Sequence, residues 1–469
     1  MSFFTKTKSI FSLFREAVMG SEQSFTTGSI DKAIFLLSVP MIMEMGMEAL
    51  FAIIDVFFVS QLHDNNAIAT IGLTESMLTI IYSIAIGLSM GATAMVARRV
   101  GEKDIKAAEV AAVQALFVGI SIAILISIVG FFYSTDLLRL MGASEAVIAT
   151  GSGYTKWMLS GNVTIMLLFL INAVFRGAGD ASIAMRSLML ANFLNIILDP
   201  LFIFGWGPVP AFGVEGAAIA TNIGRGIGVL YQVYHLLKGK KSIIRLHAEN
   251  LILQWNIVWN LLKVSAGGTA QFVIASASWI FLVRIVSTFG SDALAGYTIA
   301  IRVIVFAILP AWGMANAAAT LVGQNLGAQQ PDRAEKSVWR TAFFNMIFLA
   351  IVTVLFFTLA TPILHFFTSD VNVLVNGIEC LQIVSLGYIF YAYGMVMSQA
   401  FNGAGDTLTP TILNFFGFWT FQIPLAYLLA IPFSFGPTGV YAAISIAESV
   451  IAIVAIFIFR RGKWKSIKI

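Results

Sequence analysis

The sequence predicts an all-α membrane protein with twelve transmembrane helices, arranged as two pseudo-symmetric six-helix bundles around a central cleft. Hydrophobic residues make up 58% of the 469 residues, and charged residues only 11%. This charged fraction is less than half that of ordinary soluble domains. The apolar residues recur in runs of about 20–30, the helix length that crosses a bilayer. Sequence landmarks also repeat at one fixed interval, which indicates two equivalent halves.

The twelve predicted spans divide into two sets of six. The first set forms an N-terminal lobe at 31–238, and the second forms a C-terminal lobe at 257–460. An amphipathic N-terminal segment (1–30), a polar linker (239–256) and a basic tail (461–469) complete the chain. The spans lie near residues 31–60, 67–97, 105–133, 147–175, 181–206, 213–238, 257–289, 292–324, 333–366, 373–402, 407–432 and 437–460.

The two halves share short motifs at the same spacing. Residues 101–109 resemble 327–335, and residues 175–180 resemble 401–406, with the same offset in both pairs. Because each half has an even number of spans, both halves take the same orientation in the membrane. The Gly-Ala-Gly-Asp ending of the second motif predicts a tight turn, with Asp180 or Asp406 capping the following helix.

Positive charge predicts the orientation. Lysine and arginine concentrate in the loops after spans two, four, six and eight, so both termini are expected to be cytoplasmic, in a plasma (inner) membrane. The net charge of +4 indicates no nucleic-acid partner, because the basic residues lie in loops and tails. The basic tail is expected to contact anionic lipid; its cations are Arg460, Arg461, Lys463, Lys465 and Lys468.

Acidic residues inside the spans are the strongest functional signal. A carboxylate costs several kcal/mol in hydrocarbon, so such residues usually face a bundle interior or a watery cavity. At the matching place in the second half, Asp55 is replaced by Phe281. A purely structural requirement would be expected in both halves, yet five of the six acids lie in the first. The six are Glu44, Glu48, Asp55, Glu75, Asp199 and Glu448.

Four polar residues are predicted to form a cation site in the first lobe. Asp55, Asp199 and Thr221 lie about 8–12 Å from the outer ends of their spans, as counted from the rise per residue of an α-helix. Asn195 precedes Asp199 by four residues and therefore shares its helical face. Carboxylate, amide and hydroxyl oxygens suit a proton or a sodium ion. No permanent metal and no cofactor beyond this coupling ion are expected.

The other acids allow several interpretations. Glu44 and Glu48, four residues apart on one helical face, could bind a cationic substrate or a second proton, as could Glu75. They could instead pair with a buried cation such as Arg225, Arg284 or Arg302. Arg225 occupies roughly the place in the first lobe that matches Glu448 in the second, which suggests an inter-span pair.

With these motifs in order along twelve repeated spans, the chain resembles the multidrug and toxic-compound extrusion (MATE) transporters. The resemblance implies export of organic cations and other amphipathic drugs, driven by inward flow of protons or sodium. It covers essentially the whole chain and is carried by residues 37–40, 54–59, 175–180, 195–200 and 216–221.

Within this family, the chain is similar to the DinF-like branch, whose cation site lies in the first lobe. The branch pattern of Asp, then Asn and Asp four apart, then Thr falls on the four residues named above. The other main bacterial branch has second-lobe acids in spans seven and ten, where this sequence has Ala275 and Tyr391.

The sequence thus predicts an antiporter that transports small molecules and works as a monomer. Two other functional classes are the alternatives. A lipid-linked oligosaccharide flippase of the same superfamily would be expected to carry basic residues for phosphates, whereas the first lobe is rich in acids. An intramembrane enzyme is suggested only by Gly87-Leu-Ser-Met-Gly91, a G-x-S-x-G match inside span two. The match is not at a strand-to-helix turn, so it is better explained as a helix-packing site, and no enzyme is predicted.

Overall fold

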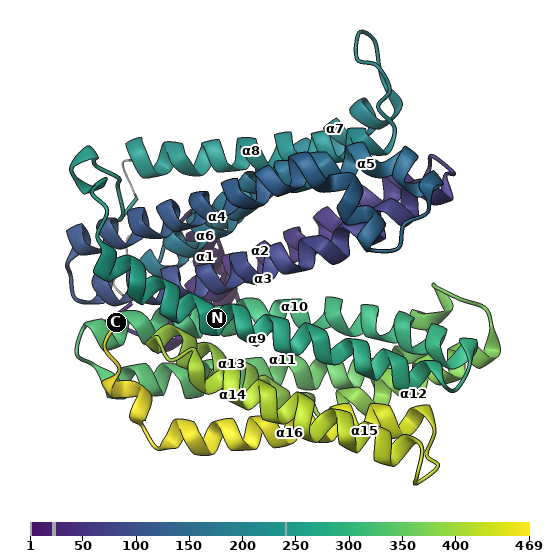
Figure 1. The fold of residues 1–469 in the computed structure, drawn as a ribbon. Helices are drawn as coiled ribbons and strands as arrows, with labels where there is room; N and C mark the ends of the chain where they lie inside the picture. The colour runs from purple at the N-terminus through teal and green to yellow at the C-terminus, as the bar shows by residue number, and fades with distance from the viewer. Residues whose placement is uncertain (1, 21–24, 240–241) are drawn as a thin grey trace. The chain divides into compact units, whose positions relative to one another are not determined.

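The computed structural model describes residues 2–20, 25–239 and 242–469, and they are almost entirely helical (Figure 1). Within these ranges the only β-type pairing is an isolated bridge between Trp206 and Val209. Residues 240 and 241 of the predicted linker lie outside the described residues. The helices are α1 (Ser2–Met19), α2 (Ile30–Ser60), α3 (Asn65–Gly101), α4 (Ile105–Leu140), α5 (Glu145–Ser160), α6 (Asn162–Ala178), α7 (Ala181–Phe204), α8 (Val214–Lys238), α9 (Trp255–Ser287), α10 (Ser291–Gly327), α11 (Pro331–His365), α12 (Val371–Ser385), α13 (Tyr388–Ala404), α14 (Leu408–Asn414), α15 (Ile423–Ala430) and α16 (Pro437–Arg460).

The chain divides into two compact units. Unit 1 comprises Met1–Ser24 and Met43–Thr269, and unit 2 comprises Phe25–Ile42 and Ala270–Ile469. The unit limits fall inside two helices, so α2 and α9 each contribute one part to unit 1 and the other part to unit 2. Helices α3–α8 belong wholly to unit 1, and α10–α16 belong wholly to unit 2.

The two units repeat the same series of helices. Helices α3 and α10 both contain 37 residues, and their starts at Asn65 and Ser291 have the same offset as the sequence motifs. Helices α6 and α13 both end at a left-handed glycine, Gly179 with φ 96° and Gly405 with φ 89°. Glycine suits this position because it has no Cβ to clash. The predicted helical repeat is therefore confirmed.

The helices have the length and composition of membrane spans. The described part of the chain contains nine helical spans that can cross a membrane, with α5 and α6 forming one of them and α14 and α15 another. There are ten when α12 and α13, bent by 58°, count as one further span. Helices α2 and α8 complete the predicted twelve. With 31 and 25 residues they are about 46 Å and about 37 Å long, enough for the hydrocarbon core of about 30 Å.

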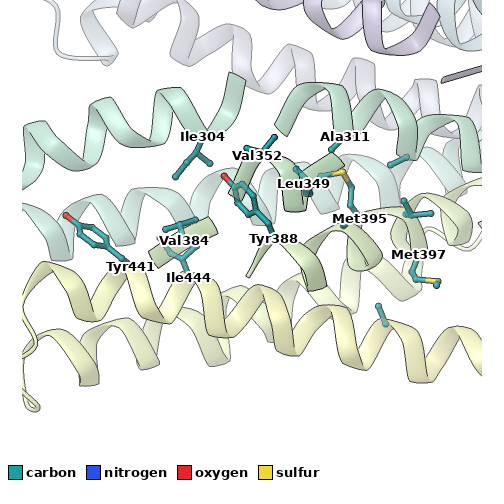
Figure 2. Packing of buried hydrophobic residues seen from close by; sticks show 14 of the residues in the cluster. Ile304, Ala311, Leu349, Val352, Val384, Tyr388, Met395, Met397, Tyr441 and Ile444 are labelled. Atoms are coloured by element: carbon teal, nitrogen blue, oxygen red, sulfur yellow. The ribbon is translucent and has the colours of Figure 1, made fainter. Parts of the chain in front are cut away.

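The core of unit 2 is formed by apolar side chains from α10, α11, α12, α13 and α16. Figure 2 shows Ile304, Val352 and Tyr388 pointing into the space between these helices, and all three are at most 7% exposed. Tyr297 and Tyr441 stack with ring centroids 6.1 Å apart. This close packing fixes the helices on which the polar residues of unit 2 lie.

The aspartates that end the two Gly-Ala-Gly-Asp motifs form different hydrogen bonds in the two units. Asp406 accepts hydrogen bonds from the Thr409 backbone N–H at 3.2 Å and the Thr409 hydroxyl at 2.7 Å, so it caps α14 as predicted. Asp180 makes no capping bond to α7, and its Oδ2 instead accepts the backbone N–H of Ile243 at 3.1 Å. The predicted cap was therefore wrong for Asp180, because the segment after α8 uses this carboxylate.

Acids at equivalent positions hold the segments that follow α8 and α16. In unit 1, Glu109 accepts the Arg245 backbone N–H at 3.2 Å and the Asn250 side-chain N–H at 2.7 Å. In unit 2, Glu335, which matches Glu109 in the repeat, pairs with Lys465 at 2.5 Å. The hydrogen bond to Glu335 raises the pKa of Lys465 above its usual value.

Part of the basic tail packs against other residues of the protein. Trp464 is 1% exposed and stacks on Phe459 at 4.7 Å, and Lys465 binds acids of α11. The expectation that the whole tail contacts lipid was thus wrong for Lys465. The other cations, Arg460, Arg461, Lys463 and Lys468, are exposed.

The G-x-S-x-G stretch packs helices together within unit 1, as expected from the sequence. It lies inside α3, and a Cβ on Gly87 would come within 2.7 Å of the Ser265 carbonyl oxygen in α9. A Cβ on Gly91 would meet the Ser265 hydroxyl at 2.6 Å. The Ser89 hydroxyl donates to the Phe169 carbonyl at 3.1 Å. These contacts explain both glycines by close approach of the two helices.

Substitution of Gly87 by valine is expected to destabilise the protein by about 1–3 kcal/mol, the usual cost of overpacking. The new side chain would push against the α9 backbone, which cannot move aside as a flexible side chain can. Thermal unfolding of the purified protein in detergent measures the effect. Gly72→Val on the same helix is the control, since nothing lies within 4 Å of its Cβ position. Equal losses in both variants would contradict this role for Gly87.

Candidate functional site

The four predicted cation-site residues come together in unit 1, from helices α2, α7 and α8. The Thr221 hydroxyl donates to Asp55 Oδ2 at 3.1 Å. The Asn195 amide donates to Asp199 Oδ1 at 3.0 Å, across one turn of α7. The carboxyl groups of Asp55 and Asp199 lie close enough to interact directly with each other. One side chain of α2 thus meets both α7 and α8.

Glycines allow α7 and α8 to approach closely enough for this arrangement. A Cβ on Gly216 would lie 2.8 Å from the Ile203 backbone nitrogen. A Cβ on Gly224 would lie 3.0 Å from the Ala191 carbonyl oxygen. Small residues at such crossings let two backbones pack directly against each other.

The site is buried and rich in unsatisfied oxygens. Asn195 and Asp199 are 0% exposed and Thr221 is 1% exposed, while Asp55 is half-buried. Three buried oxygens lack a hydrogen-bond donor among the described residues: Asp55 Oδ1, Asn195 Oδ1 and Asp199 Oδ2. Ionised carboxylates only accept hydrogen bonds, so two in contact need a shared proton or a bridging cation. This donor set therefore fits a proton or a small hard cation.

Arg225 of α8 lies beside this pair and connects it to Glu48. Its guanidinium donates to Glu48 Oε1 at 3.2 Å and to the Tyr82 hydroxyl at 3.2 Å. It also lies over the Phe51 ring at 4.6 Å. Its charge acts on Asp55 as well. Arg225 therefore links the candidate site to Glu48.

Glu44, one turn before Glu48, pairs with a second arginine. Arg176 donates to Glu44 Oε1 at 2.6 Å, and Asn172 donates to the same oxygen at 3.0 Å. Gln232 and Ser187 donate to Asn172 Oδ1, the serine at 3.4 Å. Glu44 is 2% exposed, so this is a buried polar network joining α2, α6, α7 and α8.

The two remaining acids, Glu75 and Glu448, have other surroundings than Glu44 and Glu48. Glu75 is exposed on α3. Arg225 bonds Glu48 and Tyr82 of its own unit, and Glu448 forms no ion pair in the described part of the chain. The inter-span pair expected for Glu448 is therefore absent from the described part of unit 2. Glu44 and Glu48 take the alternative left open by the sequence, pairing with buried cations.

Sequence reasoning missed Arg176, Asn172 and Tyr82. The charge pattern places Arg176 among the basic residues of the loop after span four. The spacing of Asn172 and Arg176, four residues apart, puts both on one helical face. Two polar residues on one face of an apolar helix were the sequence signal that could have identified Asn172 and Arg176. No sequence pattern indicated Tyr82.

Comparisons with known proteins agree with the resemblance. A model of the MatE family matches residues 40–201 and 269–428. A probable multidrug resistance protein NorM from Thermotoga maritima is 28% identical over 439 residues, covering 93% of each chain. The multidrug export protein MepA of Staphylococcus aureus is 22% identical, covering 92% of this chain and 94% of its own.

Solved structures of transporters match nearly the whole fold. One, described as an outward-facing multidrug resistance MATE family transporter of the MOP superfamily, has a TM-score of 0.88 at 27% identity and covers 94% of this chain and 98% of its own. A MOP superfamily transporter from Pyrococcus furiosus has a TM-score of 0.88 at 27% identity, covering 95% and 98%. Since the family model spans more than half of the sequence, the chain belongs to the MatE family of multi-pass multidrug efflux transporters.

Proposed function

We propose that this protein is a secondary active antiporter that exports organic cations and amphipathic drugs in exchange for inward-moving H⁺ or Na⁺. The observation that carries the coupling is the buried contact between Asp55 and Asp199, with unsatisfied oxygens on both carboxyl groups. The family and the multidrug names of the relatives support the substrate class. The four residues of the candidate site bind the coupling ion.

Ion binding at this site can change how α2 packs against α7 and α8. Asp55 is on α2, and the groups that contact it are on α7 and α8. A proton or sodium ion between Asp55 and Asp199 neutralises part of their mutual repulsion and holds α2 against α7. Loss of the ion restores the repulsion and favours another arrangement of α2. Ion binding thereby shifts the population between conformations, as alternating access of the two lobes requires.

The protein works as a monomer in a plasma (inner) membrane, with both termini cytoplasmic. The lysines and arginines of the loops after spans two, four, six and eight support this orientation. In this orientation the coupling ion reaches the candidate site from outside and moves inward, and the substrate leaves in the opposite direction, to the outside.

A flippase for lipid-linked sugars is less well supported. Such a transporter needs basic side chains available to phosphate. In unit 1 the buried arginines Arg176 and Arg225 are bonded to Glu44 and Glu48. None of the relatives reported above is described as a flippase.

The proposal predicts ion-driven drug movement in proteoliposomes containing only the purified protein. A pH gradient or a sodium gradient, imposed separately, is expected to drive accumulation of a cationic dye. Adding the dye should in turn release the same ion, because coupling is reciprocal. The ion whose release follows dye addition is the coupling ion. Dye movement that neither gradient changes would contradict antiport.

A further inference from the structure

Unit 2 contains one acid that neither the repeat nor the coupling site explains. Glu448 is the twelfth of the 24 residues of α16, so it lies about 17 Å from either helix end. It is half-buried, and among the residues described it has no hydrogen bond and no ion pair. A carboxylate at this depth costs several kcal/mol in hydrocarbon, so a functional role is the default expectation.

Aromatic side chains from three other helices of unit 2 form one connected group that reaches this carboxylate. Tyr391 of α13 lies near Glu448 of α16 and Trp312 of α10, and it interacts electrostatically with Glu448. Phe272 of α9 meets Trp312 edge to face, with ring centroids 5.4 Å apart. All three aromatic residues are half-buried, as is Glu448. The four side chains thus retain exposed surface while being held by four different helices.

The packing of unit 2 holds this aromatic group in place. Trp312 and Tyr391 both pack against the buried apolar core. Ala311, adjacent to Trp312, and Met395, one turn after Tyr391, lie within that core (Figure 2). Aromatic rings fixed in this way lose little conformational entropy when a ligand binds.

We infer that Glu448, Tyr391, Trp312 and Phe272 form a binding site for a hydrophobic organic cation within unit 2. An aromatic wall attracts a cation through the negative faces of its rings, and tryptophan and tyrosine do so best. Glu448 supplies the counter-charge that the site otherwise lacks. Lipophilic ammonium and phosphonium ions combine a delocalised or shielded positive charge with apolar surface, and they are the class that these groups recognise. The inference rests on the proposed function and assigns a substrate site to it.

A purely structural role for Glu448 is less consistent with its surroundings. Glu379, another half-buried acid of unit 2, shows what a structurally satisfied carboxylate looks like: its Oε2 accepts the Thr438 hydroxyl at 2.8 Å. Glu448 has no equivalent donor among the described residues. A metal ion is also a poor fit, since no group of three acidic, histidine or cysteine ligands exists in the described part of the chain.

The test measures binding of tetraphenylphosphonium to the purified full-length protein by equilibrium dialysis. Glu448→Gln is expected to weaken binding about tenfold, and Trp312→Leu by a similar or smaller factor, as loss of a partly desolvated charge or cation–π contact implies. Glu448→Asp should retain most of the affinity. Tetraphenylborate, which has the same shape and the opposite charge, should not bind more weakly to Glu448→Gln than to the wild type.

Glu379→Gln is the matched control and should bind tetraphenylphosphonium as the wild type does. Equal binding by Glu448→Gln and wild type, or equal weakening in both glutamine variants, would overturn the assignment. So would a wild-type protein that does not bind tetraphenylphosphonium at all. Normal gel-filtration profiles of the variants exclude misfolding as the cause.

The proposed antiport function can be tested independently of the binding site assigned to Glu448. Asp199→Asn should lose gradient-driven movement of tetraphenylphosphonium while still binding it in a Glu448-dependent way. If antiport itself were wrong, wild-type vesicles would show no gradient dependence, yet the difference in binding between Glu448→Gln and Glu379→Gln would persist. If only the site assignment were wrong, gradient-driven movement would persist and that difference would be absent.

Discussion

Replacing Asp55 or Asp199 by asparagine is expected to reduce ion-driven drug efflux by at least about tenfold, the factor that about 1.4 kcal/mol of lost coupling free energy gives. Asparagine keeps the size of the side chain, but it can neither release a proton nor offer a charged oxygen to sodium. The contact between the new amide and the remaining carboxyl group then no longer depends on the ion. Efflux from vesicles under an imposed gradient measures the loss.

Two companion measurements separate loss of coupling from loss of folding. Downhill drug movement without an ion gradient should survive in both variants, because the drug itself can still drive the change of conformation. Thr221→Ser keeps the hydroxyl that donates to Asp55 and should remain close to wild type. Full gradient-driven efflux in both asparagine variants would rule out this pair as the coupling site.

Arg176→Met is expected to cost about 3–5 kcal/mol of stability, because it leaves the Glu44 carboxylate buried without its cation. Glu44 is 2% exposed, and the distance across the pair is 2.6 Å. The double variant Glu44→Gln/Arg176→Met should recover most of the loss, since a neutral amide can still bond Asn172. Reversible unfolding in mixed micelles of the wild type, the two single variants Glu44→Gln and Arg176→Met, and the double variant gives the four free energies of a double-mutant cycle.

The chain offers an exposed pair of similar length as a control. Arg99 and Glu102 are 2.7 Å apart, with side chains 35% and 31% exposed. Exposed pairs contribute at most about 1 kcal/mol, so Arg99→Met should have a small effect. Similar losses in Arg99→Met and Arg176→Met would show that burial does not govern the strength of the Glu44 pair.

The fold class follows from local properties of the sequence. Helix length, low charge and the fixed repeat interval are each visible without coordinates, and they predicted α3 and α10 as equivalent helices. Depth in the membrane can be counted along each helix from its constant rise per residue. This count predicted that Asp55, Asp199 and Thr221 would lie at similar depths, and the structure brings these three together with Asn195.

The choice of partners depended on the tertiary structure. Spacing alone did not show that Glu48 would bond Arg225, that Glu44 would bond Arg176, or that Glu75 would be exposed. Each of these outcomes depends on how a helix is rotated about its axis and which neighbours it packs against. Close packing of many side chains across several helices fixes that rotation.

The sequence by itself determined a repeated helical membrane fold and the residues of the candidate coupling site, because periodicity and spacing act within one helix. Only the tertiary structure decided which acids are neutralised by arginine and which, like Glu448, face aromatic rings without a cation. A charged side chain in a low-dielectric interior depends on its immediate neighbours, and in this bundle most of those neighbours come from other helices.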